Sequence, residues 1–600
     1  MKKMKIINLW VMIGMLVSCN DFMEPYPNGG YTTDDIWDYQ AMVQGLIGEC
    51  YESSYLPRNY NNNEGTYLDG ATDDAVITST THNIRRLAVG ALPSSSDPFL
   101  TYWDRGYKGI FLVNTFLKDR NGYHTRFMVD EHKNNLIRTR LQGEAFALRA
   151  WFLWDLLQKF GGKGMNGEML GVPILLEPVD MEEAEGLTRN TYDECVQQIL
   201  SDCDSAFKYL PIAHRDFLVT DDADKALAGS RYWGRFDGIT TRAIKANVYL
   251  TWASPRFNPG NIAARWDSAA VNAKKVMDFK ENVDGIVANG FNKSTGVNWV
   301  NPNFPGIVFT SRYNNANDAM EKMFYPGGFQ GNGNIGATQD LVDAFPMSNG
   351  YPKDHPLGAA LYDPQNPYAN RDPRFYSIIF HNQAQAKKNN TGAVMYTFEN
   401  WDGAKDAPGP INNSRTNYHI KKFVFMGLNW SENNPNKQPH SKFFIRWAHM
   451  CLAFAEAANH VAGPTDASKY GISAKDAIAY LRSRKTYDNA DGFLSDPYLD
   501  EVAGQGKDAF NEFIRNERRL ETCFEGIRFF DLRRWSTDVE TLNKPVHMAK
   551  ITRNTDDTFT YDLGQEVESR VFRSAYLPIP YQEMLRMGNL IQNEGWDNWK

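Results

Sequence analysis

Apolar side chains recur with a helical period through the first half of the chain. The clearest run has apolar residues three or four positions apart at Leu141, Ala145, Leu148, Phe152 and Leu156. This spacing places all of them on one face of an α-helix, and the Gly-Gly pair that follows marks its end. Similar patterns predict further helices at residues 99–116, 192–210, 241–253 and 268–277.

The pattern changes in the middle of the chain. Residues 282–442 are rich in Gly, Asn, Pro and aromatic residues and contain one clear helical pattern, at Thr338–Ala344. An irregular segment of this length is uncommon inside a compact domain unless it carries function or local structure of its own. Helical patterns return at residues 443–460, 474–483 and 507–520.

These patterns predict an all-α fold with irregular additions. We divide the chain into an N-terminal helical scaffold (32–281), a loop-rich, aromatic-rich ligand-binding insert (282–442) and a C-terminal helical part (443–600), all within one unit. Recurring helix pairs suggest a helical-repeat scaffold, although no regular period of about 34 residues is visible.

The N-terminus has the pattern of a secretion signal. Three lysines precede an apolar run, Ile6–Val17, which is too short to span a membrane, since a spanning helix needs roughly twenty residues. Leu16-Val17-Ser18-Cys19 resembles a lipobox, so we expect residues 1–18 to be removed, Cys19 to be acylated, and residues 19–31 to form a flexible leader. The alternative is an ordinary signal peptide that ends near a cysteine.

Composition excludes several classes of protein. The net charge is −8 and no long basic block is present, so nucleic acid is not an expected partner. The five remaining cysteines lack the spacing of a zinc site and are expected in the core. Aromatic residues make up 13% of the chain, more than a core of this size requires, which suggests that some rings face a ligand.

No established catalytic motif is present, and we predict no catalytic residue, no metal ligand and no cofactor. The acidic pairs Asp34-Asp35, Asp73-Asp74 and Asp221-Asp222 could in principle serve glycoside hydrolysis, but adjacent carboxylates rarely do so. Asp221, Asp222 and Asp224 lack the EF-hand spacing. A solvated acidic turn is therefore favoured over a structural calcium site, which stays open as an alternative.

The insert contains the most informative cluster. Sugars present an apolar face of C–H groups and a rim of hydroxyls, so their sites need flat rings together with amide, guanidinium or acidic groups. The sequence between residues 299 and 330 supplies both, and we predict glycan-binding roles for Trp299, Arg312, Tyr313, Asn314, Asn315, Tyr325 and Phe329. The alternative is that these rings pack beneath a long loop.

The charged run Asn516-Glu517-Arg518-Arg519-Leu520-Glu521 is given a structural role. Charged residues at these spacings on a helix usually form a solvated or salt-bridged face. We therefore do not assign catalysis to it.

Several segments together resemble the SusD/RagB family of outer-membrane nutrient-binding lipoproteins of Bacteroidota. The resemblance covers almost the whole mature chain and rests on segments that begin at Cys19, Gly143, Arg242, Ala337 and Asn370 and on the two near the end, NERRLETCFEGIRFFDLRRW (516–535) and YLPIPYQEM (576–584). The chain departs from the family pattern where residues 163–171 separate the Gly-Gly turn from Val172-Pro173.

The resemblance implies a tetratricopeptide-like helix-pair scaffold and a non-catalytic, cell-surface lipoprotein of the outer membrane. It also implies capture of an oligo- or polysaccharide and its delivery to a SusC-like TonB-dependent β-barrel transporter. Ligand regions transfer from the family only as the loop after Thr72-Asp73-Asp74, which adds Asp73 and Arg85 to the predicted site, and the insert before Ala337.

Two other functions stay open at this point. One is a peptide-binding lid of a similar transporter, in which aromatic platforms would matter less. The other is a surface glycoside hydrolase, which would need two carboxylates about 5 to 10 Å apart across a cleft.

Overall fold

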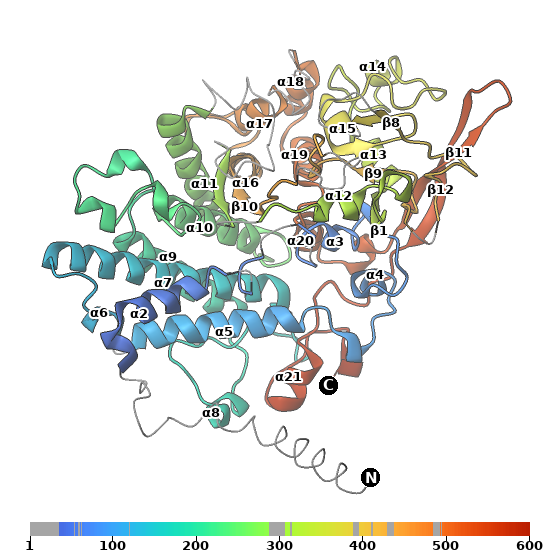
Figure 1. Cartoon of the computed structure of the whole chain (residues 1–600). Helices are drawn as coiled ribbons and strands as arrows, with labels where there is room; N and C mark the ends of the chain where they lie inside the picture. Colours follow the sequence, from blue (N-terminus) through green and yellow to red (C-terminus); the bar gives the residue numbers. More distant parts are fainter. Residues whose placement is uncertain are drawn as a thin grey trace, which may run out of the picture.

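The structure is a computed structural model in which residues 35–599 are described, except 53, 58–59, 62, 119–120, 287–305, 312–314, 388–394, 410–411, 429–436, 484–492 and 494. Long helices dominate the N-terminal half and short elements dominate the middle of the chain (Figure 1). The all-α class predicted from the sequence is confirmed, with six small two-stranded sheets added among the described residues.

The N-terminal scaffold is a series of packed helices. α5 (Leu100–Leu117) packs against α7 (Glu131–Phe160), α7 against α9 (Tyr192–Tyr209), α9 against α10 (Gly238–Ala253), and α10 against α11 (Ala263–Asp284). Figure 1 shows these helices lying side by side in the blue to green part of the molecule. Each helix predicted from the sequence in this half is present, and α7 extends further toward the N-terminus than its apolar run.

Local sequence explains how closely these helices approach. The α5–α7 contact requires glycine, because a Cβ atom at Gly109 would lie 2.5 Å from the ring of Phe152. Capping side chains fix where helices begin: the Asp130 carboxylate accepts a hydrogen bond from the amide of Lys133, and Thr191 and Glu194 form a capping box at the start of α9.

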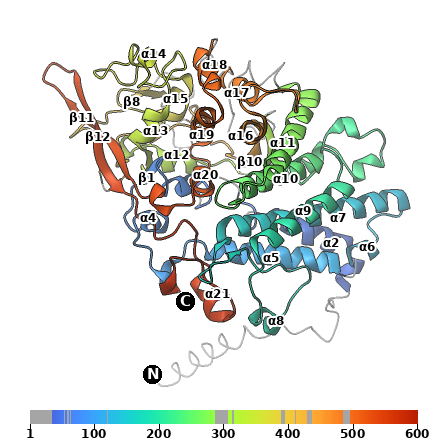
Figure 2. The same cartoon turned by 180° about the vertical axis from the view of Figure 1, so that it is seen from behind.

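The helical array continues after the insert. α11 packs against α16 (Trp447–Ala462), which in turn contacts α17 (Ala474–Arg482) and α19 (Lys507–Thr522). Figure 2 shows α10, α11 and α16 as neighbours, although more than 160 residues separate α11 from α16 in sequence. The insert therefore separates, in sequence, two helices that pack against each other in the fold.

A short two-stranded sheet brings the two ends of the insert together. β4 (Ile307–Thr310) pairs with β10 (Phe443–Arg446) in antiparallel orientation. The sequence predicted a helix from residue 443, but its first four residues form this strand and the helix begins at Trp447. The predicted helix at 338–344 is confirmed as α13 (Gln339–Ala344), with Thr338 as its N-cap.

The C-terminal part contains a β-hairpin that the sequence analysis did not predict. β11 (Pro545–Arg553) and β12 (Phe559–Ser569) form a long hairpin whose tip projects from the body of the molecule (Figure 1). Loop backbone supports the other edge of β11, since the amide of Asp402 donates to the carbonyl of Ile551 at 2.8 Å. The description of residues 443–600 as helical is therefore wrong for this segment.

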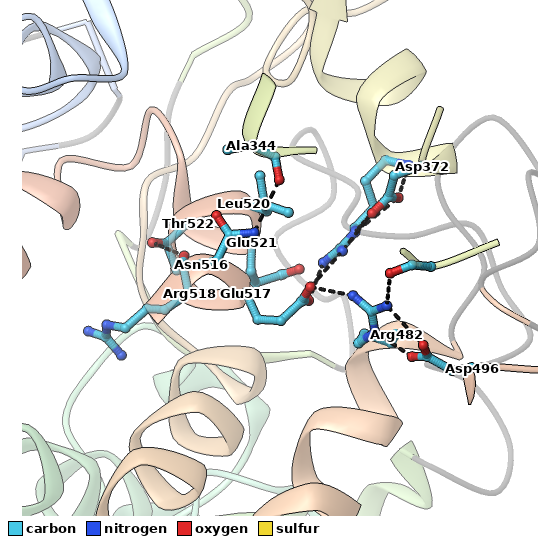
Figure 3. A network of polar contacts seen from close by, with 12 residues as sticks. Ala344, Asp372, Arg482, Asp496, Asn516, Glu517, Arg518, Leu520, Glu521 and Thr522 are labelled. Carbon is cyan, nitrogen blue, oxygen red and sulfur yellow. Dashed lines mark hydrogen bonds and ion pairs between the residues drawn. The ribbon is translucent and has the colours of Figure 1, made fainter. Parts of the chain in front are cut away.

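The charged run on α19 is salt-bridged and structural, as predicted, and most of its residues are buried. Figure 3 shows Glu517 facing Arg482, and the Glu517 carboxylate also accepts hydrogen bonds from Arg374 at 2.9 and 3.3 Å. Arg374 and Arg482 are held in turn by Asp372 and Asp496. This network joins the insert to the C-terminal helices.

The remaining elements are short. The helices are α2 (Gln40–Glu49), α3 (Thr66–Asp69), α4 (Asn83–Ala88), α6 (Asn121–His124), α8 (Met181–Glu185), α12 (Ala319–Phe324), α14 (Pro356–Ala359), α15 (Pro373–Ile378), α18 (Pro497–Gly504), α20 (Arg528–Trp535) and α21 (Tyr581–Arg586). The strands are β1 (Ala75–Ile77), β2 (Gly162–Lys163), β3 (Met169–Leu170), β5 (Ile335–Ala337), β6 (Ile379–Phe380), β7 (Gln385–Lys387), β8 (Met395–Thr397) and β9 (His419–Ile420). Residues 163–171, where the family pattern is interrupted, contribute to the β2–β3 hairpin.

Candidate functional site

The predicted site residues fall into three groups. Five of them lie outside the described residues: Cys19, Trp299, Arg312, Tyr313 and Asn314. Asn315 is exposed in the segment before α12. The others are described, and their surroundings give each of them a structural role.

Two predicted stacking rings lie in the core. Tyr325 is 1% exposed and Phe329 is 0% exposed, and their ring centroids lie 4.5 Å apart. Phe329 also stacks on Tyr396 at 4.5 Å. The prediction that these rings face a ligand is therefore wrong in this structure, because they form the hydrophobic core of the insert, where burial of their large apolar surface stabilises an otherwise irregular segment.

Asp73 is engaged in ion pairs with arginines of the C-terminal part. Its carboxylate lies 2.9 Å from Arg528 and 3.3 Å from Arg519. Burial by itself would raise the pKa of the Asp73 carboxyl, but the two guanidinium groups outweigh burial and hold this pKa well below its usual range. Asp73 therefore serves as a charged anchor for α19 and α20, and its predicted contact with a ligand is not supported.

The two regions indicated by the family resemblance do meet in space. β1 pairs with β5 in antiparallel register, with Ala75 opposite Ala337 and Ile77 opposite Ile335. The pairing continues beyond the strands, since the amide of Thr78 donates to the carbonyl of Asn334 at 2.9 Å. The loop after β1 therefore lies beside the segment that precedes β5.

A third segment, residues 412–416, packs closely against this pair. A Cβ atom at Gly336 would lie 1.8 Å from Oγ of Ser414, so only glycine permits the approach. Gly333 has a φ of +54°, a left-handed conformation that also favours glycine. The Thr78 hydroxyl donates to the carbonyl of Gly333 at 2.5 Å, which fixes the first two segments together.

These three segments and the β11–β12 hairpin surround a groove of about 800 Å³. Most of its lining residues are polar: hydroxyl groups come from the loop after β1, amides from the insert and the hairpin, and one guanidinium and one exposed carboxylate complete the set. The lining residues are Thr78, Ser79, Thr80, Asn332, Asn334, Pro408, Gly409, Asn412, Arg415, Met548, Gln565, Glu566 and Val567.

Arg85 is buried beside the groove and holds groove residues in place through hydrogen bonds and an ion pair. Its guanidinium donates to the carboxylate of Glu568 and, at 3.1 Å, to the carbonyl of Thr78. Glu568 is also paired with Arg415 and Arg570, so three guanidinium groups share one buried carboxylate. Arg85 was predicted to contact a ligand, but it is buried and acts instead as a positioning residue for Thr78 and Arg415.

An aromatic pair adjoins the groove. Tyr67 stacks on His82 with ring centroids 4.5 Å apart, and its hydroxyl accepts a hydrogen bond from the side chain of Asn334 at 3.1 Å. Both rings are half-buried. This pair combines flat rings with an amide, as predicted for a glycan site, but it consists of other residues than those predicted.

The groove combines donors and acceptors suited to a ligand rich in hydroxyl groups. Asn332 and Asn412 are exposed, and each amide can both donate and accept. Sequence reasoning missed these two residues because single asparagines in loops carry no signal by themselves. The sequence Gly331-Asn332-Gly333-Asn334, typical of tight turns, was the available indication that backbone comes close to another segment here.

The acidic turn at residues 220–224 is occupied by local hydrogen bonds. Asp221 accepts from the amides of Ala223 and Asp224, and Asp224 accepts from the amide of Thr220. Among the described residues, no group of three or more His, Cys, Asp or Glu side chains is arranged to hold a metal ion. Within the same part of the chain, we find no helix whose length and apolar content would let it cross a membrane.

Comparison with known proteins places this architecture in a family. Residues 284–596, more than half of the chain, match the SusD family, and residues 21–230 match a second group described as "Starch-binding associating with outer membrane". The chain therefore belongs to the SusD family.

Individual relatives agree with this assignment. The chain is 23% identical to SusD-like protein P38 of Formosa agariphila, over 90% of this chain and 94% of that protein. A SusD-like protein of Bacteroides fragilis has a similar structure, with a TM-score of 0.67, 21% identity and coverage of 94% of this chain and 99% of that one. A SusD-like carbohydrate binding protein of the same species gives a TM-score of 0.65, 18% identity and coverage of 92% and 99%.

Proposed function

We propose that this chain is a cell-surface lipoprotein that captures an oligo- or polysaccharide in the groove and delivers it to a SusC-like TonB-dependent transporter. The observation that carries the proposal is the groove itself, because its hydroxyls and the amides of Asn332 and Asn334 come from the two regions that the family resemblance indicated as ligand regions. Asn412 and Arg415, from the third segment, add an amide and a guanidinium. A solved relative of the same fold is described as a carbohydrate binding protein, which supports the same class of ligand.

The proposal includes attachment to the outer membrane through an acylated Cys19. A lipid anchor of more than one acyl chain supplies stable attachment without a spanning helix. The second group of proteins that the chain matches carries the outer membrane in its description, in keeping with this location.

The proposal does not include catalysis. Hydrolysis of a glycosidic bond uses two carboxyl groups across the substrate. Among the described groove residues, Glu566 supplies one carboxylate, and the nearby Glu568 is paired with three guanidinium groups. This arrangement favours binding over hydrolysis.

The test is binding of a soluble form that starts after Cys19 to a panel of polysaccharides, by retardation in glycan-containing gels, with released reducing ends assayed in parallel. We expect retardation by at least one glycan and no new reducing ends. An open groove of this kind predicts a Kd in the micromolar to millimolar range, about −4 to −8 kcal/mol.

Two substitutions locate the site. Asn332→Ala removes one exposed side-chain amide. Asn412→Gly removes the other, and glycine is chosen because it tolerates the φ of +64° at position 412. Each lost hydrogen bond contributes about 0.5–1.5 kcal/mol, so the double variant should raise the Kd by roughly 5- to 150-fold. Asn589→Ala, which replaces an exposed asparagine that does not line the groove, is the matched control and should bind normally.

Either of two results would contradict the proposal. New reducing ends in the wild-type reaction would show an enzyme. Retardation that persists unchanged in the double variant would show that glycan binds elsewhere on the chain.

A further inference from the structure

Two buried arginines lie side by side without a carboxylate. Arg256 follows α10 and is 6% exposed, and Arg533 lies on α20 and is 7% exposed. The backbone carbonyl of Arg533 accepts a hydrogen bond from Nε of Arg256, which brings the two residues together. Among the described residues, neither guanidinium has an Asp or Glu within ion-pair distance, unlike Arg85, Arg374 and Arg482.

Both guanidinium groups retain unused donors. Nη2 of Arg256 and Nε of Arg533 are buried and have no hydrogen-bond partner in the described part of the chain. The other contacts of Arg533 do not neutralise its positive charge. Its guanidinium donates to the backbone carbonyl of Phe529 at 2.9 Å and lies 3.5 Å from the centroid of the Phe529 ring. A buried, uncompensated charge is strongly destabilising, so the fold requires a counter-charge here.

Both arginines line one small cavity. Its volume is about 30 Å³, whereas roughly 10–15 Å³ is enough to hold one water molecule. Tyr192 also lines it, and its buried hydroxyl is likewise without a partner among the described residues. Three buried donors without a partner among the described residues therefore belong to side chains that line this cavity of about 30 Å³.

The charge around the cavity is entirely positive. Lys159 and Arg534 line it as well, but both have carboxylate partners, Asp155 for Lys159 and Glu456 for Arg534. None of the described residues that line the cavity is acidic. Burial, together with the neighbouring guanidinium of Arg256, lowers the pKa of Arg533 well below its usual range, which expresses the same lack of negative charge.

We infer that this cavity binds a small inorganic anion, of the class of chloride, between the guanidinium groups of Arg256 and Arg533. A monatomic anion fits the volume, accepts several hydrogen bonds at once and neutralises charge that water could only solvate. A polyatomic anion such as phosphate has too many atoms for the same space.

The position of the cavity gives the anion a structural role. Its walls come from the end of α7, the start of α9, the residues after α10, from α20 and from residues 575–577. The N-terminal scaffold and the C-terminal part therefore meet around it, and the amide of Arg256 already donates to the carbonyl of Arg534 at 3.2 Å. A bound anion would join these two parts of the fold, independently of any glycan.

The first test is direct and uses the wild-type chain. Crystals of the soluble form grown in bromide should show an anomalous difference peak between Arg256 and Arg533, because bromide replaces chloride at such sites. The absence of a peak at this position, whatever peaks occur elsewhere on the surface, would overturn the proposal.

The second test measures thermal unfolding at constant ionic strength, with chloride exchanged for gluconate, which is too large for the cavity. Raising chloride from about 2 to about 200 mM should raise the wild-type midpoint by about 1–2 °C, by mass action on the folded state. Equal midpoints in the two salts would contradict the inference.

Substitution connects the salt effect to the cavity. Arg533→Met keeps an unbranched side chain and removes the charge, so the dependence on chloride should disappear. Arg586→Met removes an arginine whose side chain is 59% exposed and should keep the wild-type dependence. If Arg533→Met does not fold, the bromide experiment decides alone; if it folds and retains the chloride effect, the assigned site is wrong.

Discussion

Glu517 is the carboxylate on which two buried arginines from different parts of the chain converge. Its Oε2 atom lies 2.9 Å from Nη1 of Arg374, and its Oε1 atom accepts a hydrogen bond from Arg482 (Figure 3). All three side chains are almost fully buried. Replacing Glu517 by Ala would leave both guanidinium groups in the core without their shared partner.

The size of the effect follows from what remains. Removing one member of a buried ion pair costs about 3–5 kcal/mol. Arg374 keeps Asp372 at 2.7 Å, and Arg482 keeps Asp496. We therefore expect the lower end of that range for Glu517→Ala, about 3 kcal/mol. Glu517→Gln should lose less, because it preserves the volume and one acceptor.

The assay is urea unfolding of the soluble form, followed by tryptophan fluorescence. Glu512→Gln on the same helix is the control, because its side chain is 70% exposed and surface substitutions stay within about 0.5 kcal/mol. A loss of less than about 1 kcal/mol for Glu517→Ala would refute the reasoning that this charge network holds the insert against the C-terminal helices.

Two further predictions concern pH and packing. Burial lowers the pKa of His419 to about 4, against 6.5 in the unfolded chain. Between pH 6.5 and 4, the unfolded chain therefore binds a proton at His419 that the folded chain does not. The free energy of unfolding should fall by roughly 1.4 kcal/mol per pH unit from this group as the pH decreases through that range. Unfolding measured from pH 7 to 4.5 should show a shallower slope in His419→Gln, and an unchanged slope would count against this. Gly336→Ala should destabilise the chain by about 1–3 kcal/mol and weaken glycan binding, because its Cβ would collide with Ser414. Gly588→Ala, with open space around it, should do neither, and equal stability of both variants would disprove the close approach.

The sequence predicted the helical scaffold well because each helix carries its own signal. The apolar faces of α7 and α9 are local patterns of a few turns, and the structure contains both helices. The β11–β12 hairpin was not predicted. β12 does alternate apolar and polar residues from Phe559 to Leu563, so a strand signal was available, but β11 shows no such alternation. The pairing of the two strands is also supported by loop backbone from residues 402 and 416.

The two regions predicted to bind ligand meet in space, whereas four of the individual residues predicted in them have structural roles instead: Tyr325, Phe329, Asp73 and Arg85. The loop after Asp74 and the segment before Ala337 meet through the β1–β5 pair, as the family resemblance indicated. For Tyr325 and Phe329, however, the sequence looks the same whether the rings face a ligand or pack in the core. Only their packing against Tyr396 and other rings distinguishes the two cases.

The sequence alone therefore determined the properties that depend on local pattern: the positions of the long helices and the motifs of the SusD family. The secretion signal and lipobox stay predictions from the sequence. Tertiary structure decided the properties that depend on which distant segments meet. Asp73 and Arg85 became ion-pair anchors because arginines and a glutamate more than 400 residues away fold against them. Asn332 and Asn412 became groove residues because glycines at 333 and 336 allow two loops to touch. Such pairings leave no periodic trace in the chain, since they are fixed by packing and charge between residues far apart in sequence.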